Sequence, residues 1–186
     1  MNKAVFWDLQ GTLGGDAIAS IELFEPYSFS KNALELSKAH GYYNIVITNQ
    51  SRIGKGLLSL EVYEHEANRI LDFFNSDKVL IDEILCCPHQ NSDKCECKKP
   101  KTKFIRDSVA KYDLDINKCF VIGDMGMNEI IMAHNAGCKG VLVLTGGGKG
   151  SLGEFRDTWK EHEADIIAEN ALEAVKSIIE YEEKSK

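Results

Sequence analysis

The sequence lacks an apolar run long enough to cross a membrane, and its start, MNKAVFWD, lacks the apolar stretch and cleavage site of a secretory signal peptide. It also lacks internal repeats and linker-like segments. Positive charge is scarce, since 22 Lys and Arg stand against 29 Asp and Glu, for a net charge of -7. We therefore expect a cytoplasmic protein that binds neither membranes nor nucleic acid, because binding a polyanion requires a basic surface.

The chain alternates between β-branched apolar runs and segments whose apolar residues have helical spacing. With 186 residues, of which 44% are hydrophobic, it is long enough for one domain, 1–186, with helices around a sheet. The expected strands are 4–8, 44–48, 81–86, 119–124, 141–145 and 166–167. The expected helices are 30–40, 59–74, 102–112, 125–135, 153–163 and 171–181, with Ser30, Ser59 and Asn170 as N-caps. This order predicts an α/β fold whose parallel sheet has helices on both faces, and we expect a monomer.

Three of the expected strands end in polar residues that can carry chemistry, namely Asp8, Thr48 and Asp124. Because parallel strands place their carboxyl ends at one edge of the sheet, we expect these side chains to meet. Two neighbouring carboxylates repel each other, and a hard cation such as Mg²⁺ relieves that repulsion while also binding phosphate. Asp8 is therefore the candidate nucleophile, and an anionic small substrate fits the site if positive groups gather there.

Four of the six cysteines fall between residues 86 and 97, a spacing that indicates metal binding rather than disulfides. Cys87 and His89 form one pair, and Cys95 and Cys97 form the other. Residues two apart in an extended chain point the same way, so each pair offers two ligands to one side. The loop 86–98 therefore predicts a closed Cys₃His site, typical of structural Zn²⁺, while Cys86 points into the core.

Four segments resemble the motifs of the haloacid dehalogenase (HAD) superfamily, and together they span residues 4 to about 145. The segment 5–12, VFWDLQGT, resembles motif I, DxDGT, and the segment 123–128, GDMGMN, resembles motif IV, GDxxxD. The segment 48–56, TNQSRIGKG, is similar to the TNQSGIGRG segment of the branch that contains heptose-bisphosphate phosphatases and histidinol-phosphate phosphatases. Zinc-bearing members of that branch have a matching CxH…CxC loop before a basic-Lys-Pro sequence, here 98–100. The chain is thus identified as resembling subfamily III of the superfamily.

This resemblance implies a Rossmann-like fold without a cap domain and a Mg²⁺-dependent phosphatase, a phosphoric monoester hydrolase that forms an aspartyl-phosphate on Asp8. The implied Mg²⁺ ligands are Asp8, the main-chain carbonyl of Gln10 and Asp124. The implied phosphate- and substrate-binding residues are Thr48, Asn49, Arg52, Lys98 and Lys99. Arg52 either grips a second anionic group or is a solvated loop residue. Asn128 stands where motif IV has its second acid, and we expect it to orient water or a neighbouring side chain.

The largest departure from the family pattern is Gln10, which replaces the acid-base Asp of motif I. An amide cannot exchange a proton near neutral pH, so protonation of the leaving group and activation of water both lose help worth roughly 10²- to 10⁴-fold in rate. Three outcomes stay open. The protein is a phosphatase aided by its substrate or by Asp16, a phosphoryl transferase with a long-lived phospho-Asp, or a non-catalytic module that binds phosphorylated ligands.

Other features receive structural interpretations. The segment 145–151, TGGGKGS, fails the P-loop pattern because Gly150, rather than Ser or Thr, follows Lys149. We interpret it as a flexible connector at the sheet edge. Cys119 and Cys138 are interpreted as core residues and His134 as an ordinary helix residue. The substrate is expected to be a small phosphorylated metabolite, such as a sugar phosphate or bisphosphate, at a fairly open edge of the sheet.

Overall fold

A single sheet of six parallel strands forms the centre of the computed structural model, which describes residues 1–184. The strand order is β3-β2-β1-β4-β5-β6. The strands are β1 (Lys3–Trp7), β2 (Tyr42–Asn49), β3 (Glu83–Cys87), β4 (Phe120–Gly123), β5 (Lys139–Val143) and β6 (Ile166–Ala168). The predicted parallel sheet is confirmed, and β1 lies between β2 and β4.

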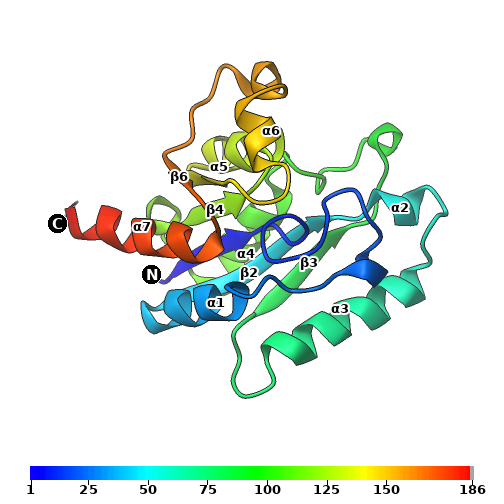
Figure 1. Cartoon of the computed structure of the whole chain (residues 1–186), viewed down its shortest axis with the longest axis horizontal. Coiled ribbons are helices and arrows are strands. Elements are labelled where there is room, and N and C mark those ends of the chain that lie inside the picture. The colour runs from blue at the N-terminus through cyan, green and yellow to red at the C-terminus, as the bar shows by residue number, and fades with distance from the viewer. Residues whose placement is uncertain (185–186) are drawn as a thin grey trace.

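Helices pack on both faces of this sheet, as the alternating sequence pattern predicts (Figure 1). They are α1 (Ser30–Ala39), α2 (Ser51–Gly54), α3 (Leu60–Phe74), α4 (Lys103–Tyr112), α5 (Ile131–Ala136), α6 (Gly148–Leu152) and α7 (Ala171–Lys184). Short 3₁₀ turns lie at Ile21–Leu23, Asn91–Asp93, Ile116–Lys118 and Arg156–Trp159, and a π-helical turn lies at Gly126–Ile130. Within residues 1–184, none of the helices has both the length and the apolar character that a membrane span requires.

The two faces of β1 bury different clusters because successive strand residues point to opposite sides. Val5 and Trp7 belong to a core cluster that includes residues of α1, α3 and α7. Ala4 and Phe6 belong to a second cluster, which includes residues of α4 and α5. All four side chains are fully buried, so β1 is fixed from both sides. The strand therefore delivers the next residue, Asp8, to a rigid position.

Two of the three predicted N-caps are confirmed. Ser59 accepts a hydrogen bond from the Val62 N–H, and Asn170 Oδ1 accepts from the first-turn amides of α7. Ser30 is instead the first residue of α1, and its buried hydroxyl donates to the carbonyl of Leu13 at 2.7 Å. That hydroxyl ties α1 to the loop after β1 rather than capping the helix.

The helix expected at 153–163 is wrong. The short helix α6 ends at Leu152, before this segment, which contains a 3₁₀ turn at Arg156–Trp159. Trp159 is buried, and its indole N–H donates to the carbonyl of Ser151 at 2.9 Å. The ring also packs so closely on Gly126 that a Cβ there would strike it. Burial of Trp159 thus determines the path of this segment in place of a continuous helix.

Candidate active site

Asp8 lies directly after the buried strand β1, and its main-chain N–H continues the ladder by donating to Ile122 of β4 at 2.9 Å. Its carboxylate accepts a hydrogen bond from the Thr12 hydroxyl at 3.2 Å. Lys99 Nζ lies 2.5 Å from the other carboxylate oxygen. Asp8 is therefore held by its strand, its turn and a lysine from a distant part of the chain.

Lys99 is buried, and its ammonium group uses all three of its N–H donors. They point to Asp8 Oδ1 at 2.5 Å, to Glu129 Oε1 at 2.8 Å and to the carbonyl of Ile47 at 2.9 Å. Burial alone would lower the pKa of Lys99, but the carboxylates of Asp8 and Glu129 outweigh it and raise that pKa above its ordinary value. Lys99 therefore stays charged beside the candidate nucleophile.

Glu129, and not Asn128, is the residue of the motif IV segment whose side chain is buried against Lys99. The π-helical turn at 126–130 widens the helix by one residue, and Glu129 there is 1% exposed and paired with Lys99. Its second oxygen accepts from the Met125 N–H at 3.1 Å. Burial and the nearby Asp8 raise the pKa of Glu129 to about 7, although Lys99 opposes that shift. Asn128 instead lines the cavity in front of the site.

Asp124 follows β4, and its carboxylate lies against the Gly-rich segment 145–151. Its Oδ2 accepts from the Gly147 N–H at 2.6 Å, and a Cβ on either Gly11 or Gly146 would strike the carboxylate. Both glycines have positive φ, at 91° and 52°. The interpretation of 145–151 as a flexible sheet-edge connector is wrong, because the close approach of its backbone to Asp124 requires glycine.

The carboxylate of Asp124 is buried close to two other carboxyl groups. Burial, followed by the negative charges of Asp8 and Glu129, raises its pKa to about 8. Three carboxyl groups thus gather around the single ammonium of Lys99. A divalent cation is the kind of ligand that would balance this charge.

Gln10 is held by a chain of amide hydrogen bonds. Its Nε2 donates to the carbonyls of Asp16 at 2.9 Å and Ala19 at 3.0 Å. Its Oε1 accepts from Gln50 Nε2 at 2.9 Å, and the same Gln50 nitrogen lies 3.0 Å from Thr48 Oγ1. Thr48 therefore accepts from Gln50 and keeps its own hydroxyl proton for another partner.

The other predicted residues take different positions around this centre. Asn49 Oδ1 accepts from the Lys99 main-chain N–H at 3.0 Å, so its amide holds the lysine segment. Lys98 Nζ donates to Ser51 Oγ and, at 3.1 Å, to the carbonyl of His89. It does not line the cavity that Asp8, Lys99 and Asp124 share, which we call the catalytic cavity. Arg52 does not line that cavity either, although its Nε is buried with no hydrogen-bond partner among residues 1–184.

Asp16, the acid considered as a substitute for the missing Asp, faces its own loop. Its carboxylate accepts from the Ile18 N–H at 3.0 Å, and only its main-chain carbonyl contacts Gln10. It is absent from the described lining of the catalytic cavity, whereas Ala17 from the same loop is part of it. The loop therefore contributes Ala17 to the lining of the cavity, while the carboxylate of Asp16 lies outside that lining.

The catalytic cavity has a volume of about 80 Å³. It is lined by Asp8, Gln10, Ala17, Thr48, Asn49, Lys99, Asp124, Met125, Asn128 and Glu129. The cavity is thus large enough for a phosphoryl-sized group. A larger cavity of about 730 Å³ lies at the opposite strand ends, beside Lys3, Phe120 and Lys139, away from these carboxylates.

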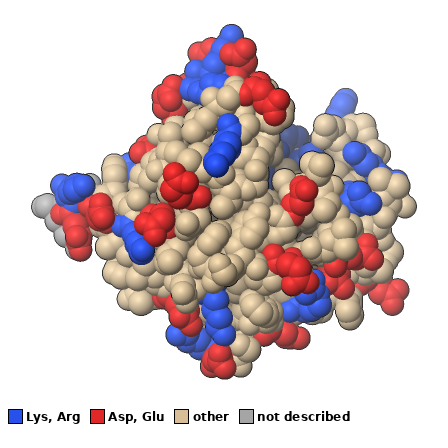
Figure 2. Space-filling model, in the orientation of Figure 1, with Lys and Arg blue, Asp and Glu red and all other residues tan. Residues whose placement is uncertain are grey.

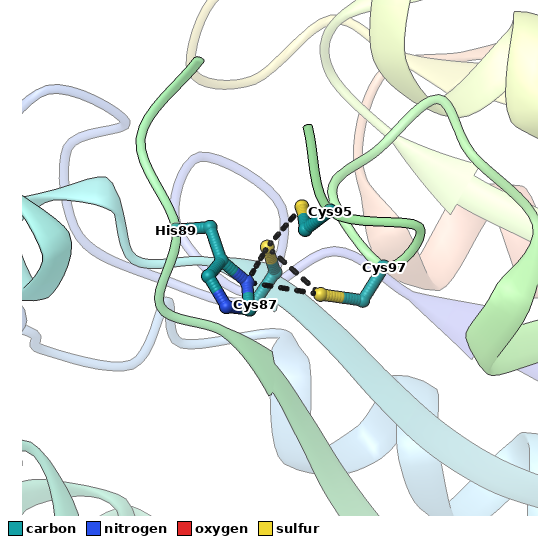
Figure 3. A group of neighbouring side chains, drawn as sticks. All are labelled: Cys87, His89, Cys95 and Cys97. Atoms are coloured by element: carbon teal, nitrogen blue, oxygen red, sulfur yellow. Dashed lines mark hydrogen bonds between the residues drawn. The ribbon is translucent and has the colours of Figure 1, made fainter. Parts of the chain in front are cut away.

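The Cys/His loop brings its four predicted ligand side chains together (Figure 3). One ligand atom from each of Cys87, His89, Cys95 and Cys97 lies within 4.8 Å of all the others. Cys97 Sγ is 3.2 Å from Cys87 Sγ and 3.3 Å from His89 Nδ1. Burial raises the pKa of Cys87 above its ordinary value, whereas hydrogen bonds from the Lys98 and Cys97 amides overcome burial and lower that of Cys95 to about 7.

The two predicted ligand pairs, Cys87 with His89 and Cys95 with Cys97, thus come together in a group that could hold a metal ion. Cys86 packs against the main hydrophobic core, on the side away from this group, as the alternation of strand side chains predicts. Cys119 and Cys138 are buried core residues, as expected.

The fold and this arrangement define a class: an α/β protein with an aspartate at the end of its central strand, facing a buried lysine. The family model described as HAD-hydrolase-like matches residues 96–174. The chain is 33% identical over 156 residues to a D-glycero-beta-D-manno-heptose-1,7-bisphosphate 7-phosphatase of Pasteurella multocida, covering 78% of this chain and 84% of that protein. It therefore belongs to the HAD superfamily, in the branch of heptose-bisphosphate and histidinol-phosphate phosphatases, which are phosphoric monoester hydrolases.

The chain is also similar to a longer protein and to a solved structure, both at lower identity. The histidine biosynthesis bifunctional protein HisB of Campylobacter jejuni is 29% identical over 171 residues, which are 89% of this chain and 45% of that longer protein. The chain thus spans less than half of this relative. The crystal structure of D,D-heptose 1,7-bisphosphate phosphatase from B. bronchiseptica, complexed with magnesium and phosphate, has a TM-score of 0.85 at 23% identity. It covers 97% of this chain and 99% of its own, and at this identity it shows the shared fold.

Two residues of the candidate site were not found by the sequence reasoning. Gln50 lies within the segment 48–56, where the sequence predicts no role for it, yet it links Gln10 to Thr48. Glu129 follows Asn128 in the sequence, but the π-helical turn that brings it inward leaves no signal in the apolar spacing. An isolated acid among apolar residues on an otherwise buried helix face is the signal that could have identified Glu129.

Proposed function

We propose that this protein hydrolyses a small phosphorylated metabolite, a sugar phosphate or bisphosphate, with Asp8 as the nucleophile and Mg²⁺ as the cofactor. The observation that carries this proposal is the convergence of Asp8, Thr48, Lys99 and Asp124 on one cavity of about 80 Å³. These residues come from segments far apart in the sequence. A structural ion pair would need only two of them.

The donor set fits Mg²⁺. Asp8 and Asp124 supply hard carboxylate oxygens. Burial, and then the negative charges of Asp8 and Glu129, raise the pKa of Asp124 despite the opposing charge of Lys99. We propose that Asp8, Asp124 and the main-chain carbonyl of Gln10 hold the ion. When bound, Mg²⁺ would neutralise phosphate charge and position a phosphoryl oxygen.

In the proposed reaction, Asp8 attacks the phosphorus atom and becomes an aspartyl-phosphate while the leaving oxygen departs with the bonding electron pair. Lys99 sits within contact of Asp8 and would stabilise charge on the transferring group. Thr48 has its hydroxyl proton free because it accepts from Gln50, so it would donate to a phosphoryl oxygen. Water then attacks the phosphorus, which releases phosphate and restores Asp8.

Gln10 sets the limits of this reaction. Both of its amide hydrogens are directed at loop carbonyls, and its oxygen already accepts from Gln50. It has neither an acidic proton nor a free N–H for the leaving oxygen. We therefore propose a phosphatase that favours substrates with good leaving groups and releases phosphate slowly from Asp8.

The substrate class rests on the relatives. Heptose bisphosphate is the substrate named for the Pasteurella multocida protein, and a sugar phosphate is accordingly our first candidate. The cavity holds little more than the phosphoryl group, so the rest of the substrate would lie outside it. Arg52, with its buried and unpaired Nε, is the proposed contact for a second anionic group.

Two alternatives follow from the same observation at Gln10. A long-lived phospho-Asp would make the protein a phosphoryl transferase, and complete loss of turnover would make it a module that binds phosphorylated ligands. Steady-state assays with Mg²⁺ and a panel of phosphosugars, comparing wild type with Asp8→Asn, separate the three when combined with intact-protein mass and thermal melting. A stable mass gain of one phosphoryl group supports the transferase. Turnover that vanishes in the variant supports the phosphatase. Thermal stabilisation by a phosphosugar without turnover or phosphoenzyme supports the binding module.

We further propose that Cys87, His89, Cys95 and Cys97 hold a structural Zn²⁺. The proposal is supported by three sulfur ligands and one nitrogen ligand within 4.8 Å of one another, a closed set with no open coordination position. The ion would hold the segment that continues into Lys98 and Lys99. Metal analysis of the purified protein should give about one Zn per chain.

A further inference from the structure

His134 and His162 form a pair of facing imidazole rings outside the candidate active site. His134 lies on α5, and His162 follows the 3₁₀ turn at Arg156–Trp159. Their Nδ1 atoms face each other at 3.0 Å, and their ring centroids are 5.2 Å apart. His134 is therefore not the ordinary helix residue that we expected, because it joins two segments that are distant in the sequence.

Asp165 fixes the protonation of the first ring. Its Oδ2 lies 3.0 Å from His134 Nε2 and also accepts from the Gly140 N–H at 2.7 Å. An ionised carboxylate only accepts hydrogen bonds, so His134 must carry its proton on Nε2. The neutral ring then presents the lone pair of Nδ1 directly to His162.

Histidines that bind transition metals commonly donate their other ring N–H to a carboxylate, as His134 does to Asp165. Two nitrogens, each about 2.0–2.1 Å from one ion and 3.0 Å from each other, subtend roughly 95° at that ion. This angle lies between octahedral and tetrahedral geometry. For both rings to bind one ion, the proton of His162 must lie on Nε2, and each ring must turn so that its Nδ1 lone pair points to the ion and not to the other ring.

We propose that His134 and His162 bind a divalent transition-metal ion of the Zn²⁺, Ni²⁺ or Co²⁺ type, with Asp165 as the positioning residue and water filling the other positions. Imidazole nitrogens favour these ions over Mg²⁺ and Ca²⁺. The side chains of His134 and Asp165 are 28% and 31% exposed, so an ion can reach them. The positive charge of Arg156, which contacts the His162 carbonyl, is paired with Glu163 at 2.5 Å.

This site differs in kind from the Cys₃His group. Only two protein ligands face the ion, so the metal would exchange readily. It would link α5 to the segment that carries Trp159, whose ring packs on Gly126 beside Met125 of the catalytic cavity. The inference does not rest on the proposed phosphatase function.

The test is titration of Ni²⁺ into the zinc-loaded, full-length protein with Mg²⁺ in excess, followed by calorimetry and by ¹⁵N NMR of the imidazole rings. We expect one Ni²⁺ site beyond the bound zinc. The paramagnetic ion should broaden the signals of His134 and His162 while those of His40 and His65 stay sharp. His134→Gln and His162→Gln should each weaken Ni²⁺ binding at least about tenfold, and Asp165→Asn by about tenfold or more.

His65→Gln is the matched control, because the side chain of His65 is 77% exposed and outside this cluster. It should leave Ni²⁺ binding unchanged. Melting curves without Ni²⁺ establish that each variant is folded. Unchanged Ni²⁺ affinity in both His134→Gln and His162→Gln, or sharp signals from both rings in saturating Ni²⁺, would overturn the site and leave a plain hydrogen bond between two imidazoles.

Discussion

Gln10 Oε1 accepts a hydrogen bond from Gln50 Nε2 at 2.9 Å, at the position where the resemblance to motif I implies an acid-base aspartate. The same Gln10 side chain donates to the carbonyls of Asp16 and Ala19. Only an amide can accept from one side and donate twice to the other. Gln10 therefore anchors the loop that contributes Ala17 to the cavity wall, in addition to any part it plays in the reaction.

Replacing Gln10 with Asp should restore a proton donor at the cost of this anchor. We predict that Gln10→Asp raises the hydrolysis of alkyl phosphates by roughly 10²- to 10⁴-fold, and that of aryl phosphates by less, because a good leaving group needs no protonation. The matched control is Gln10→Asn, which shortens the side chain equally without adding an acid. Rates across a series of leaving groups make the comparison. Equal rates for the two variants on every ester would remove the role that we assign to position 10.

Glu129 offers a second prediction. In Glu129→Gln, Lys99 loses a charge-assisted hydrogen bond of 2.8 Å, worth about 1.5–3 kcal/mol. We expect kcat/KM to fall roughly 10- to 100-fold. Asn128→Ala, at the neighbouring position on the same π-helical turn, should change it far less. A larger loss in the Asn128 variant would show that the motif register, and not the structure, identifies the functional residue.

Stability should depend on pH through Asp124 when Mg²⁺ is removed. Its pKa is about 8 in the folded protein, against an ordinary value of 3.8. Between these values the folded state binds more protons than the unfolded state, so the free energy of unfolding falls as pH rises. In EDTA, the melting temperature should drop more between about pH 5.5 and 8.5 in wild type than in Asp124→Asn. Saturating Mg²⁺ should reduce the drop in wild type, and an equal drop in both proteins would contradict the account.

The Cys/His group gives a fourth prediction. Cys97→Ser should lose zinc and lower the melting temperature, because binding energy at a structural site contributes to folding. It should also lower activity, since Lys98 contacts the carbonyl of His89 inside the loop. Cys119→Ala is the control, because Cys119 is buried in the hydrophobic cluster that contains Ala4 and Phe6, outside the Cys/His group. This variant should keep the metal. Full zinc content in Cys97→Ser would exclude the proposed ligand set.

Strand ends and ligand spacing carried most of what the sequence could predict. Asp8 and Asp124 follow buried apolar runs, and the parallel arrangement alone brings such ends to one edge of the sheet. The pairs at 87–89 and 95–97 have a spacing that few other roles require. Both patterns depend on local chain geometry, which can be predicted from the types and spacing of neighbouring residues.

The features that the sequence did not reveal depend on packing between distant segments. The side chain of Glu129 is buried because of a π-helical turn, and the backbone of Gly146 lies against the Asp124 carboxylate. The buried Trp159, which donates to the Ser151 carbonyl, lies in a 3₁₀ turn where a helix was expected. Acidic and basic side chains are also interspersed over the face shown in Figure 2, so surface charge alone does not mark the site. The positions of Glu129, Gly146 and Trp159 each depend on a contact with a distant residue, which sequence spacing cannot identify.

The most direct test of the central claim is intact-protein mass spectrometry after rapid acid quench, with Mg²⁺ and an aryl phosphate as substrate. We predict that wild type gains the mass of one phosphoryl group, that the label maps to the peptide containing Asp8, and that Asp8→Asn gains none. Undiminished turnover in Asp8→Asn, or a phosphoryl group on another residue, would contradict the account.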